Sequence, residues 1–587
     1  MSETAPNELI LGLVHEGWDH LRLQRPIAAW ACWRRVLRLE PEQPAATHAL
    51  HVLANVGDLP EAARAEYRFL TPLPGRRDDW DAHFRGRDLE DLAEAARVFG
   101  ELADRDPSDS HARFNQGICL AWQGRNVEAI EALDQAVQSM AASEPQTAAD
   151  AWVLAEVLRQ GGGAELLADD LSHVVPIQWS PGADPADFLD DRADVRAIAN
   201  PVDPVTGSPR LSEARLYEWL DRPWTAEPTS ALATPADLRR VRATVVRLPG
   251  SLRLSGTDPV LLEEVVAEVA RLAGDRVATV RREASPMPLA FQDAAVWAIR
   301  MPPGLDDEAQ ARLHRAAVER YYETVWILRP RQGLGGRSPV DAGKLANLGD
   351  VVIRVKLEAV IRLREQLGMR RTTALLYQGY PFDRLRRRLG LEPTDPDAID
   401  PLDAASMSGP ELDQLEPVDL DDYTLAEAYE SAAALGDDRR TARFAGVLAD
   451  REPLALSRLD RRALFASLVR FELADGSTSG ALRRIDRALE VDRILQQGRD
   501  ARTYQTWRAE VHVKVGEAEA AVAVYDNLIG TTADPWVAID AAETLLDAGF
   551  LEPGRTMVHQ ALNLAEESGD LEAIERGKEL LLVEVDG

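Results

Sequence analysis

The chain has 587 residues, too many for one ordinary hydrophobic core, and this length favours about three to four units. Its formal net charge of −31 at pH 7 argues against general binding to nucleic acid, because a polyanion is repelled unless the positive charge is segregated. Cys32 and Cys119 are the two cysteines, which excludes a disulfide framework and favours a reducing compartment. The sequence has neither a secretory signal nor a run of about 18 apolar residues, so we expect a cytoplasmic protein without a membrane span.

Residues 8–160 repeat a pattern of small residues at a nearly fixed period. The first small residue of each expected second helix is 33 or 34 residues from the next, at Ala29, Ala62, Ala95 and Ala129. In the stretch "NQGICLAWQGRNVEAIEALDQAV", residues 115–137, the break at Gly124 is typical of a turn between two short helices. Such a hairpin cannot bury its own apolar face and must stack on its copies. We therefore predict an N-terminal array of helical hairpins, with Ala129 and Ala136 buried against a neighbouring helix.

The repeat is lost between residues 165 and 330, where a small α+β domain is predicted. Residues 238–256 alternate apolar and polar side chains on both sides of Pro249-Gly250, which is typical of a β-hairpin. Residues 258–275 form an amphipathic helix, with Asp258 as its N-cap and Gly274 as its C-cap. Two further strands are expected at residues 276–284 and 294–302, followed by a long helix at residues 306–328. A binding or dimerisation module is the ordinary role of such a domain.

Positive charge is concentrated in the next segment, a basic helical segment at residues 331–390. Residues 329–388 contain 14 Lys or Arg against 5 Asp or Glu, a net charge of +9. A short helix there carries a candidate basic patch, in which only the first and last members share a helix face: Arg384, Arg386, Arg387 and Arg388. We expect a solvated basic helix, and nucleic-acid binding is the alternative.

An acidic linker follows at residues 391–422, with 11 acidic residues and no basic one. Its Pro, Asp and Ser content predicts an extended segment, which could lie across the basic helix and neutralise it. A second array of helical hairpins is predicted over residues 423–580. Its expected turns are at Gly476, Gly516 and Gly549, with a degenerate hairpin around Gly436 before them.

Both arrays resemble the tetratricopeptide repeat family, which has a period of 34 residues, an Ala in the second helix, an aromatic residue four positions later and a closing Pro. Ala95, Phe99 and Pro107 follow this pattern in one copy. The resemblance implies stacked hairpins whose first helices line a concave groove, and hence a protein-interaction scaffold. It places these residues on the groove: Trp18, Arg22, His48, His51, Phe114, Asn115 and Trp122 in the first array, and Trp507, Glu510 and Lys514 in the second.

The segment "YYETVWILRPRQGLGGRSPVDAG", residues 321–343, and the helix after it resemble the toxin-binding region of the MbcA, ParS and Xre antitoxin group. Ser338 stands where that group usually has Thr. The resemblance implies an adaptor that binds a toxin-like protein through the centre of the chain.

No catalytic or metal-binding motif is present in the sequence. A His-Glu-x-x-His pattern, a Walker loop and a Gly-x-Ser-x-Gly elbow are all missing. His48 and His51 are three residues apart and are interpreted as surface or groove histidines rather than metal ligands. We therefore expect no enzyme activity, no cofactor and no metal.

The sequence predicts a mainly α protein, in which two tetratricopeptide-like solenoid arrays flank a smaller α+β domain. The predicted function is a non-enzymatic scaffold that binds a protein or peptide partner, with nucleic acid and membrane not expected as partners. The alternative is an adaptor or regulator whose central basic segment binds a toxin-like protein or nucleic acid. The oligomeric state stays open.

Overall fold

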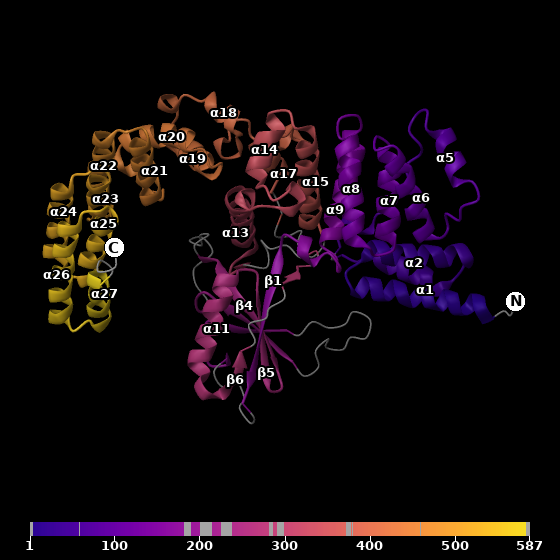
Figure 1. Ribbon diagram of the computed structural model, residues 1–587, viewed down its shortest axis with the longest axis horizontal. Helices are drawn as coiled ribbons and strands as arrows, with labels where there is room; N and C mark the ends of the chain where they lie inside the picture. Colours follow the sequence, from indigo (N-terminus) through magenta and orange to yellow (C-terminus); the bar gives the residue numbers. More distant parts are fainter. Residues whose placement is uncertain are drawn as a thin grey trace. The chain divides into compact units, whose positions relative to one another are not determined.

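The computed structural model describes residues 4–57, 59–180, 189–199, 214–224, 237–280, 286–289, 291, 299–370, 377, 380–457 and 459–582. The chain divides into two units, residues 1–399 and 400–587 (Figure 1). The predicted architecture, mainly α with a smaller sheet region in its middle, is confirmed.

Unit 1 begins with antiparallel helices that follow the predicted repeat. Asp91 and Asp109 cap two of them by accepting hydrogen bonds from backbone N–H groups of the first turn. Ala129 and Ala136 are fully buried, and the predicted turn at Gly124 has a left-handed φ of 71°. The helices are α1 (Thr4–Arg22), α2 (Pro26–Leu39), α3 (Pro44–Asn55), α4 (Glu61–Arg64), α5 (Arg77–Phe84), α6 (Leu92–Arg105), α7 (Ser110–Trp122), α8 (Asn126–Met140) and α9 (Pro145–Arg159).

The second repeat departs from the predicted hairpin. Its second helix, α4, ends after four residues, and residues 65–73 continue in neither helix nor strand. Pro72 and Pro74 would stop a longer helix nearby, because proline lacks the N–H that a helix interior needs. The shortened α4 packs against α2, α9 and α15 (Val351–Gly368).

Helix α15 is the packing partner of α9, although about 190 residues separate them in the sequence. Ion pairs tie α15 to the array: Arg362 Nη2 lies 2.9 Å from Asp150 Oδ1, and Lys356 pairs with Asp134. The sheet domain is thus inserted between α9 and the helix that covers it.

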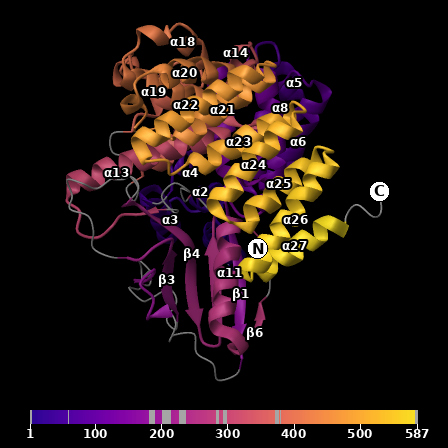
Figure 2. The same ribbon diagram turned by 90° about the vertical axis from the view of Figure 1, so that its left-hand side faces the viewer.

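The inserted domain is an antiparallel sheet with the strand order β2-β3-β4-β5-β1-β6 among the described residues. The predicted hairpin is confirmed, because Leu248 pairs with Ser251 across Pro249-Gly250. Helix α11 (Pro259–Ala273) lies along this sheet, as Figures 1 and 2 show. Val265 and Val269 of α11 are buried in the core that the helix shares with the strands. Most of the strand expected at residues 294–302 lies outside the described residues. The strands are β1 (Leu171–Trp179), β2 (Val195–Ile198), β3 (Arg215–Leu220), β4 (Arg239–Leu248), β5 (Ser251–Gly256), β6 (Val277–Val280), β7 (Met287–Pro288) and β8 (Ile299–Arg300).

A buried ion network joins the start of β1 to the helices after the sheet. Asp170 Oδ1 accepts a hydrogen bond from Arg331 at 3.1 Å, and Asp170 Oδ2 forms an ion pair with Arg364 at 2.6 Å; all three side chains are almost completely buried. Burial alone would raise the pKa of Asp170, but the two guanidinium groups outweigh it and hold this pKa well below its usual range. The network therefore fixes how the sheet domain connects to α15.

The remaining helices of unit 1 confirm the predicted long helix and its successors. Helix α13 continues into a π-helical turn (Tyr321–Val325), and Ser338 caps α14 by accepting a hydrogen bond from the Asp341 N–H. The helices are α13 (Asp307–Arg320), α14 (Pro339–Asn347), α15 and α17 (Phe382–Arg388).

The acidic segment at residues 391–422 is not the extended linker that was predicted. It forms short helices, η8 (Pro396–Ala398), η9 (Ala404–Ser406), α18 (Gly409–Asp413) and η10 (Pro417–Asp419), and it buries Met407 and Leu412. The segment carries apolar residues among its 11 acidic ones, and these give the short helices something to bury. Arg440 holds it by a bidentate pair with Asp413.

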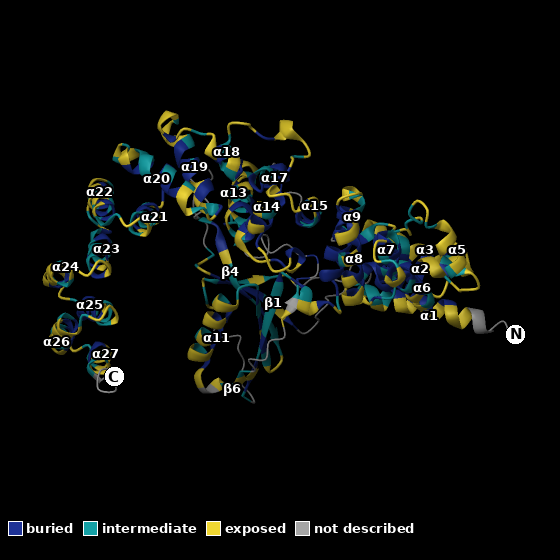
Figure 3. Ribbon diagram, turned by 45° about the horizontal axis from the view of Figure 1, so that its top comes forward, coloured by how far each residue is buried: buried dark blue, intermediate teal, exposed yellow. Residues whose placement is uncertain are grey.

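Unit 2 is a series of helical hairpins, as predicted. The turn glycines Gly436, Gly476, Gly516 and Gly549 all have positive φ, which a residue without a Cβ adopts at little cost. In Figure 3 the helices of this unit carry buried residues on one side and exposed residues on the other. They are α19 (Asp422–Ala434), α20 (Asp438–Asp450), α21 (Arg461–Ala474), α22 (Thr478–Gln496), α23 (Ala501–Lys514), α24 (Ala518–Thr532), α25 (Pro535–Asp547), α26 (Leu551–Ser568) and α27 (Leu571–Leu582).

Candidate partner-binding grooves

The predicted groove residues of helix α7 already hold a segment of the same chain. Asn115 is fully buried and forms hydrogen bonds with both the backbone N–H and the backbone carbonyl of Leu70. Its Oδ1 accepts from the Leu70 N–H at 2.8 Å, and its Nδ2 donates to the Leu70 carbonyl at 2.9 Å. One turn earlier, His111 Nδ1 lies 2.6 Å from the carbonyl oxygen of Thr71. Residues 65–73 therefore occupy this face of α7.

The aromatic residues predicted as partner anchors also pack within the chain. Trp122 stacks on Trp30, with ring centroids 6.1 Å apart, and contacts Phe69 at 5.1 Å. Trp18 meets the buried Trp33 edge to face at 5.0 Å. The expectation of open aromatic anchors in the first array is therefore corrected, because the shortened second repeat supplies Phe69 from residues 65–73.

The other predicted residues of the first array do not form one site. Arg22, His48 and His51 are exposed, and Arg22 pairs with Asp19 at 2.8 Å. Phe114 is buried, with 6% of its surface exposed.

The exposed basic patch predicted on α17 is wrong. Arg384 and Arg388 share a face, as the spacing indicated, but that face meets Glu323 at 3.0 and 3.8 Å. Arg386 is 1% exposed and pairs with Glu358 and Glu365 of α15, while Arg387 is half-buried. Glu323, Glu358 and Glu365 thus supply carboxylates that pair with the arginines of this helix.

The second array keeps an open groove between α21 and α23, of about 430 Å³. All three residues predicted there line it, Trp507, Glu510 and Lys514. The rest of its lining is mostly apolar and comes largely from the preceding repeat: Ala463, Ala466, Val469, Arg470, Leu473 and Val511.

Helical spacing explains why these side chains converge. Positions 463, 466, 470 and 473 on α21, and 507, 510, 511 and 514 on α23, each recur every three or four residues and so share one face of their helix. Trp507 is half-buried and rests edge to face on the buried Tyr504, with centroids 5.2 Å apart. Trp507 thus packs on Tyr504 with part of its surface and lines the groove with the rest.

Charged residues border this apolar surface. Arg470 and Lys514 are exposed at the groove, and Glu510 lies between them in the lining. Glu510 is open to solvent on one side, yet the protein around it raises its pKa by desolvation.

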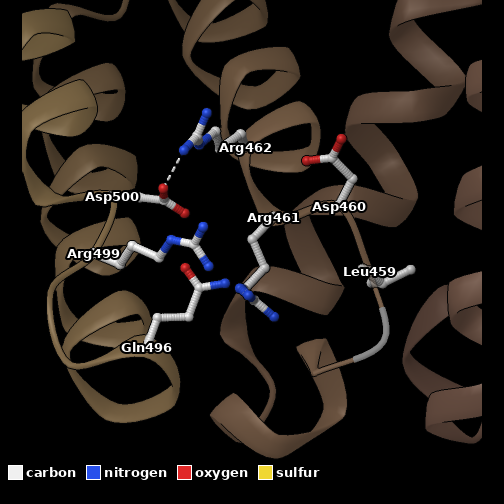
Figure 4. Close-up of a pocket in the computed structure, with 7 residues that line it drawn as sticks. All are labelled: Leu459, Asp460, Arg461, Arg462, Gln496, Arg499 and Asp500. Carbon is white, nitrogen blue, oxygen red and sulfur yellow. Dashed lines mark hydrogen bonds and ion pairs between the residues drawn. The ribbon is translucent and has the colours of Figure 1, made fainter. Parts of the chain in front are cut away.

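A separate polar pocket of about 360 Å³, here called the arginine pocket, lies at the start of α21 and is lined by Arg461, Arg462 and Arg499. Figure 4 shows the guanidinium groups of Arg461 and Arg499 directed toward the space beside Gln496. Arg462 pairs with Asp500, which in turn donates its backbone N–H to Asp492 at 3.1 Å. Asp460 and Asp500 also line the pocket, so three arginines stand against two aspartates and the lining has a small net positive charge.

The α21 half of the groove was not among the residues predicted from the sequence. The sequence does indicate it. Val469 and Leu473 are four residues apart in the first helix of one repeat, and Trp507 and Val511 have the same spacing in the first helix of the next repeat. The arginine pocket had no signal of its own, because it needs the loop at residues 497–500 to bring Arg499 back to the start of α21.

Comparison with known proteins identifies the class of repeat. Residues 87–146 match the family model of the tetratricopeptide repeat. These residues hold α6, α7 and α8, so the chain contains tetratricopeptide repeats, which typically serve as interaction modules rather than catalysts. No curated protein matches the sequence.

Two solved structures are similar over nearly the full chain at low identity. One is yeast Tom70, with 10% identity, coverage of 98% of this chain and 96% of that chain, and a TM-score of 0.21. The other is the APC/C hetero-tetramer Cut9–Hcn1, with 11% identity, coverage of 99% and 97%, and a TM-score of 0.20. None of the described helices has the length and apolar character that crossing a bilayer requires.

Proposed function

We propose that this chain is an interaction scaffold whose second array binds a peptide segment of a partner protein between α21 and α23. The observation that supports this most directly is the groove itself, where Trp507 stands open beside Val469, Leu473 and Val511. A large aromatic in an apolar depression with a charged rim is the usual composition of an interface hot spot. In the first array, residues 65–73 cover helix α7. The residues that line the second groove all belong to α21 and α23 and include no such covering segment.

The charges around the groove favour an acidic, apolar partner segment. Arg470 and Lys514 outnumber Glu510 in the lining, and the arginine pocket continues the positive charge toward the start of α21. The chain as a whole is strongly acidic, so this local positive surface would select acidic ligands that the remaining surface repels. The proposed ligand therefore carries one large apolar side chain with Asp or Glu close to it.

The alternative has two forms, and binding of a toxin-like protein through residues 321–370 stays a prediction. The nucleic-acid form relied on an exposed basic helix. Arg384, Arg386 and Arg388 face carboxylates of their own chain. Nothing in the geometry of α17 favours nucleic acid over these partners.

The proposal is tested by selecting peptides from a random display library on the purified full-length chain. The best peptides are then titrated against the wild type and against Trp507→Ala. Truncating a hot spot costs about 2 kcal/mol or more, so the dissociation constant should rise roughly 30-fold or more. Leu571→Ala is the matched control, since Leu571 is an apolar residue, 79% exposed, that lies outside the groove. Equal affinity for both variants would place the binding site elsewhere.

A further inference from the structure

Three side chains with metal-ligand chemistry meet in the first hairpin of unit 1. Glu16 and His20 are four residues apart on one face of α1, and Cys32 faces them from α2. The carboxylate oxygen, imidazole nitrogen and thiol sulfur lie within 4.8 Å of one another, and His20 Nε2 is 3.7 Å from Glu16 Oε1. Among the described residues, this is the one group of three or more such side chains that meets so closely.

The surrounding fold holds the three groups at different depths. Cys32 is buried, with 8% of its surface exposed, His20 is half-buried and Glu16 is open to solvent. The turn at Gly124 abuts the His20 ring, since a Cβ at residue 124 would lie 2.9 Å from His20 Cε1. The imidazole is therefore confined by the turn between α7 and α8, while the exposed carboxylate leaves a route for an ion to enter.

The chemistry of these groups suits a divalent cation. Imidazole, thiolate and carboxylate are all ligands of such ions, and the three ligand atoms are already within 4.8 Å of one another. A divalent ion would compensate the two negative charges of a Cys32 thiolate and the Glu16 carboxylate.

We propose that Glu16, His20 and Cys32 form a binding site for a zinc-like divalent cation. Thiolate, imidazole and carboxylate are the donors that Zn²⁺ prefers, and ligand atoms about 2.0–2.3 Å from one ion lie roughly 3–4 Å from each other. The 3.7 Å between His20 Nε2 and Glu16 Oε1 is already within that range, and the Cys32 sulfur lies within 4.8 Å of both atoms. On binding, the Cys32 thiol releases its proton to solvent as the sulfur–metal bond forms, and water completes the fourth position.

A metal at this point would pin α1 to α2 and support the turn at Gly124. The sequence did not indicate the site, because Cys32 is 12 residues beyond His20 and only the hairpin brings the two together. The site is independent of the groove in the second array.

The experiment is a cobalt titration of the full-length, metal-free chain, followed by absorption spectroscopy. We expect one equivalent of Co²⁺ to produce a thiolate-to-cobalt charge-transfer band together with tetrahedral visible bands, and one equivalent of Zn²⁺ to remove them. Cys32→Ser should abolish the charge-transfer band, and Glu16→Gln should weaken Co²⁺ binding at least tenfold. Cys119→Ser is the matched control, because Cys119 is also buried, with its pKa raised to about 12, yet lies outside the cluster.

Two results would overturn the proposal: no thiolate band in the wild type, or the same band in Cys32→Ser. If circular dichroism shows that Cys32→Ser does not fold, His20→Gln replaces it, since the half-buried ring can be exchanged for a smaller polar side chain. A full-strength tetrahedral spectrum in folded His20→Gln would equally refute the assignment.

Discussion

Replacing Asn115 with Leu should release residues 65–73 from helix α7. The substitution keeps a branched side chain of similar size but removes both hydrogen bonds to Leu70, which measure 2.8 and 2.9 Å. Each such bond contributes about 0.5–1.5 kcal/mol net, so the two together hold the segment by about 1–3 kcal/mol. At 1.4 kcal/mol per factor of ten, local opening should become roughly 5- to 150-fold more frequent.

Hydrogen exchange of the full-length chain, followed by mass spectrometry, measures this opening directly. The Leu70 amide should exchange faster by that factor, while α8 and the helices of unit 2 keep their protection. Gln138→Ala is the control, because Gln138 is exposed on α8 and its side chain bonds only Asp134. Unchanged exchange in residues 65–73 of a folded Asn115→Leu variant would show that Asn115 does not hold the segment.

Ala129→Leu should cost about 1–3 kcal/mol of stability in denaturant unfolding, because Ala129 is fully buried and extra methyl groups overpack the hairpin; an unchanged midpoint would contradict this. Asp170→Asn should destabilise unit 1 by about 3–5 kcal/mol, since it leaves Arg331 and Arg364 buried without their carboxylate. The fold lowers the pKa of Asp170, so the stability that its carboxylate contributes is fully present above the unfolded pKa of about 4. The difference in free energy of unfolding between the wild type and Asp170→Asn should therefore shrink as the pH falls below that value. The pKa of Glu510 is raised in the fold, so its ionised form opposes folding, and Glu510→Gln should slightly stabilise unit 2 at pH 7. Binding of an acidic peptide should strengthen as pH falls toward the raised pKa of Glu510, and titrations of the Glu510→Gln variant should not show this dependence.

Local signals were sufficient wherever neighbouring residues decide the structure. The turns at Gly436, Gly476, Gly516 and Gly549 could be predicted from the helical period and the glycine alone, and all four glycines have the positive φ of such a turn. The β4–β5 hairpin and the caps of α11 followed from alternation and from Asp258 and Gly274. Strand β1 was missed because Pro176 lies inside it, and a proline usually argues against a strand.

Long-range contacts account for the failures. Residues 65–70 have ordinary helical composition, but Asn115 and Trp122 hold the segment extended from about 45 residues away. The arginines of α17 looked exposed because Glu323 and Glu365 are distant in sequence and adjacent only in the fold. Of the two predicted grooves, the second agrees better with the structure, because Trp507, Glu510 and Lys514 all line one open groove.

Whether partners bind between α21 and α23 can be decided by a hydrogen-exchange footprint of the full-length chain with a saturating library-selected peptide. We expect new protection to be confined to residues 463–473 and 507–514, and to disappear in Trp507→Ala at the same peptide concentration. Protection that falls on residues 65–73 and α7 instead, with α21 and α23 unchanged, would contradict it.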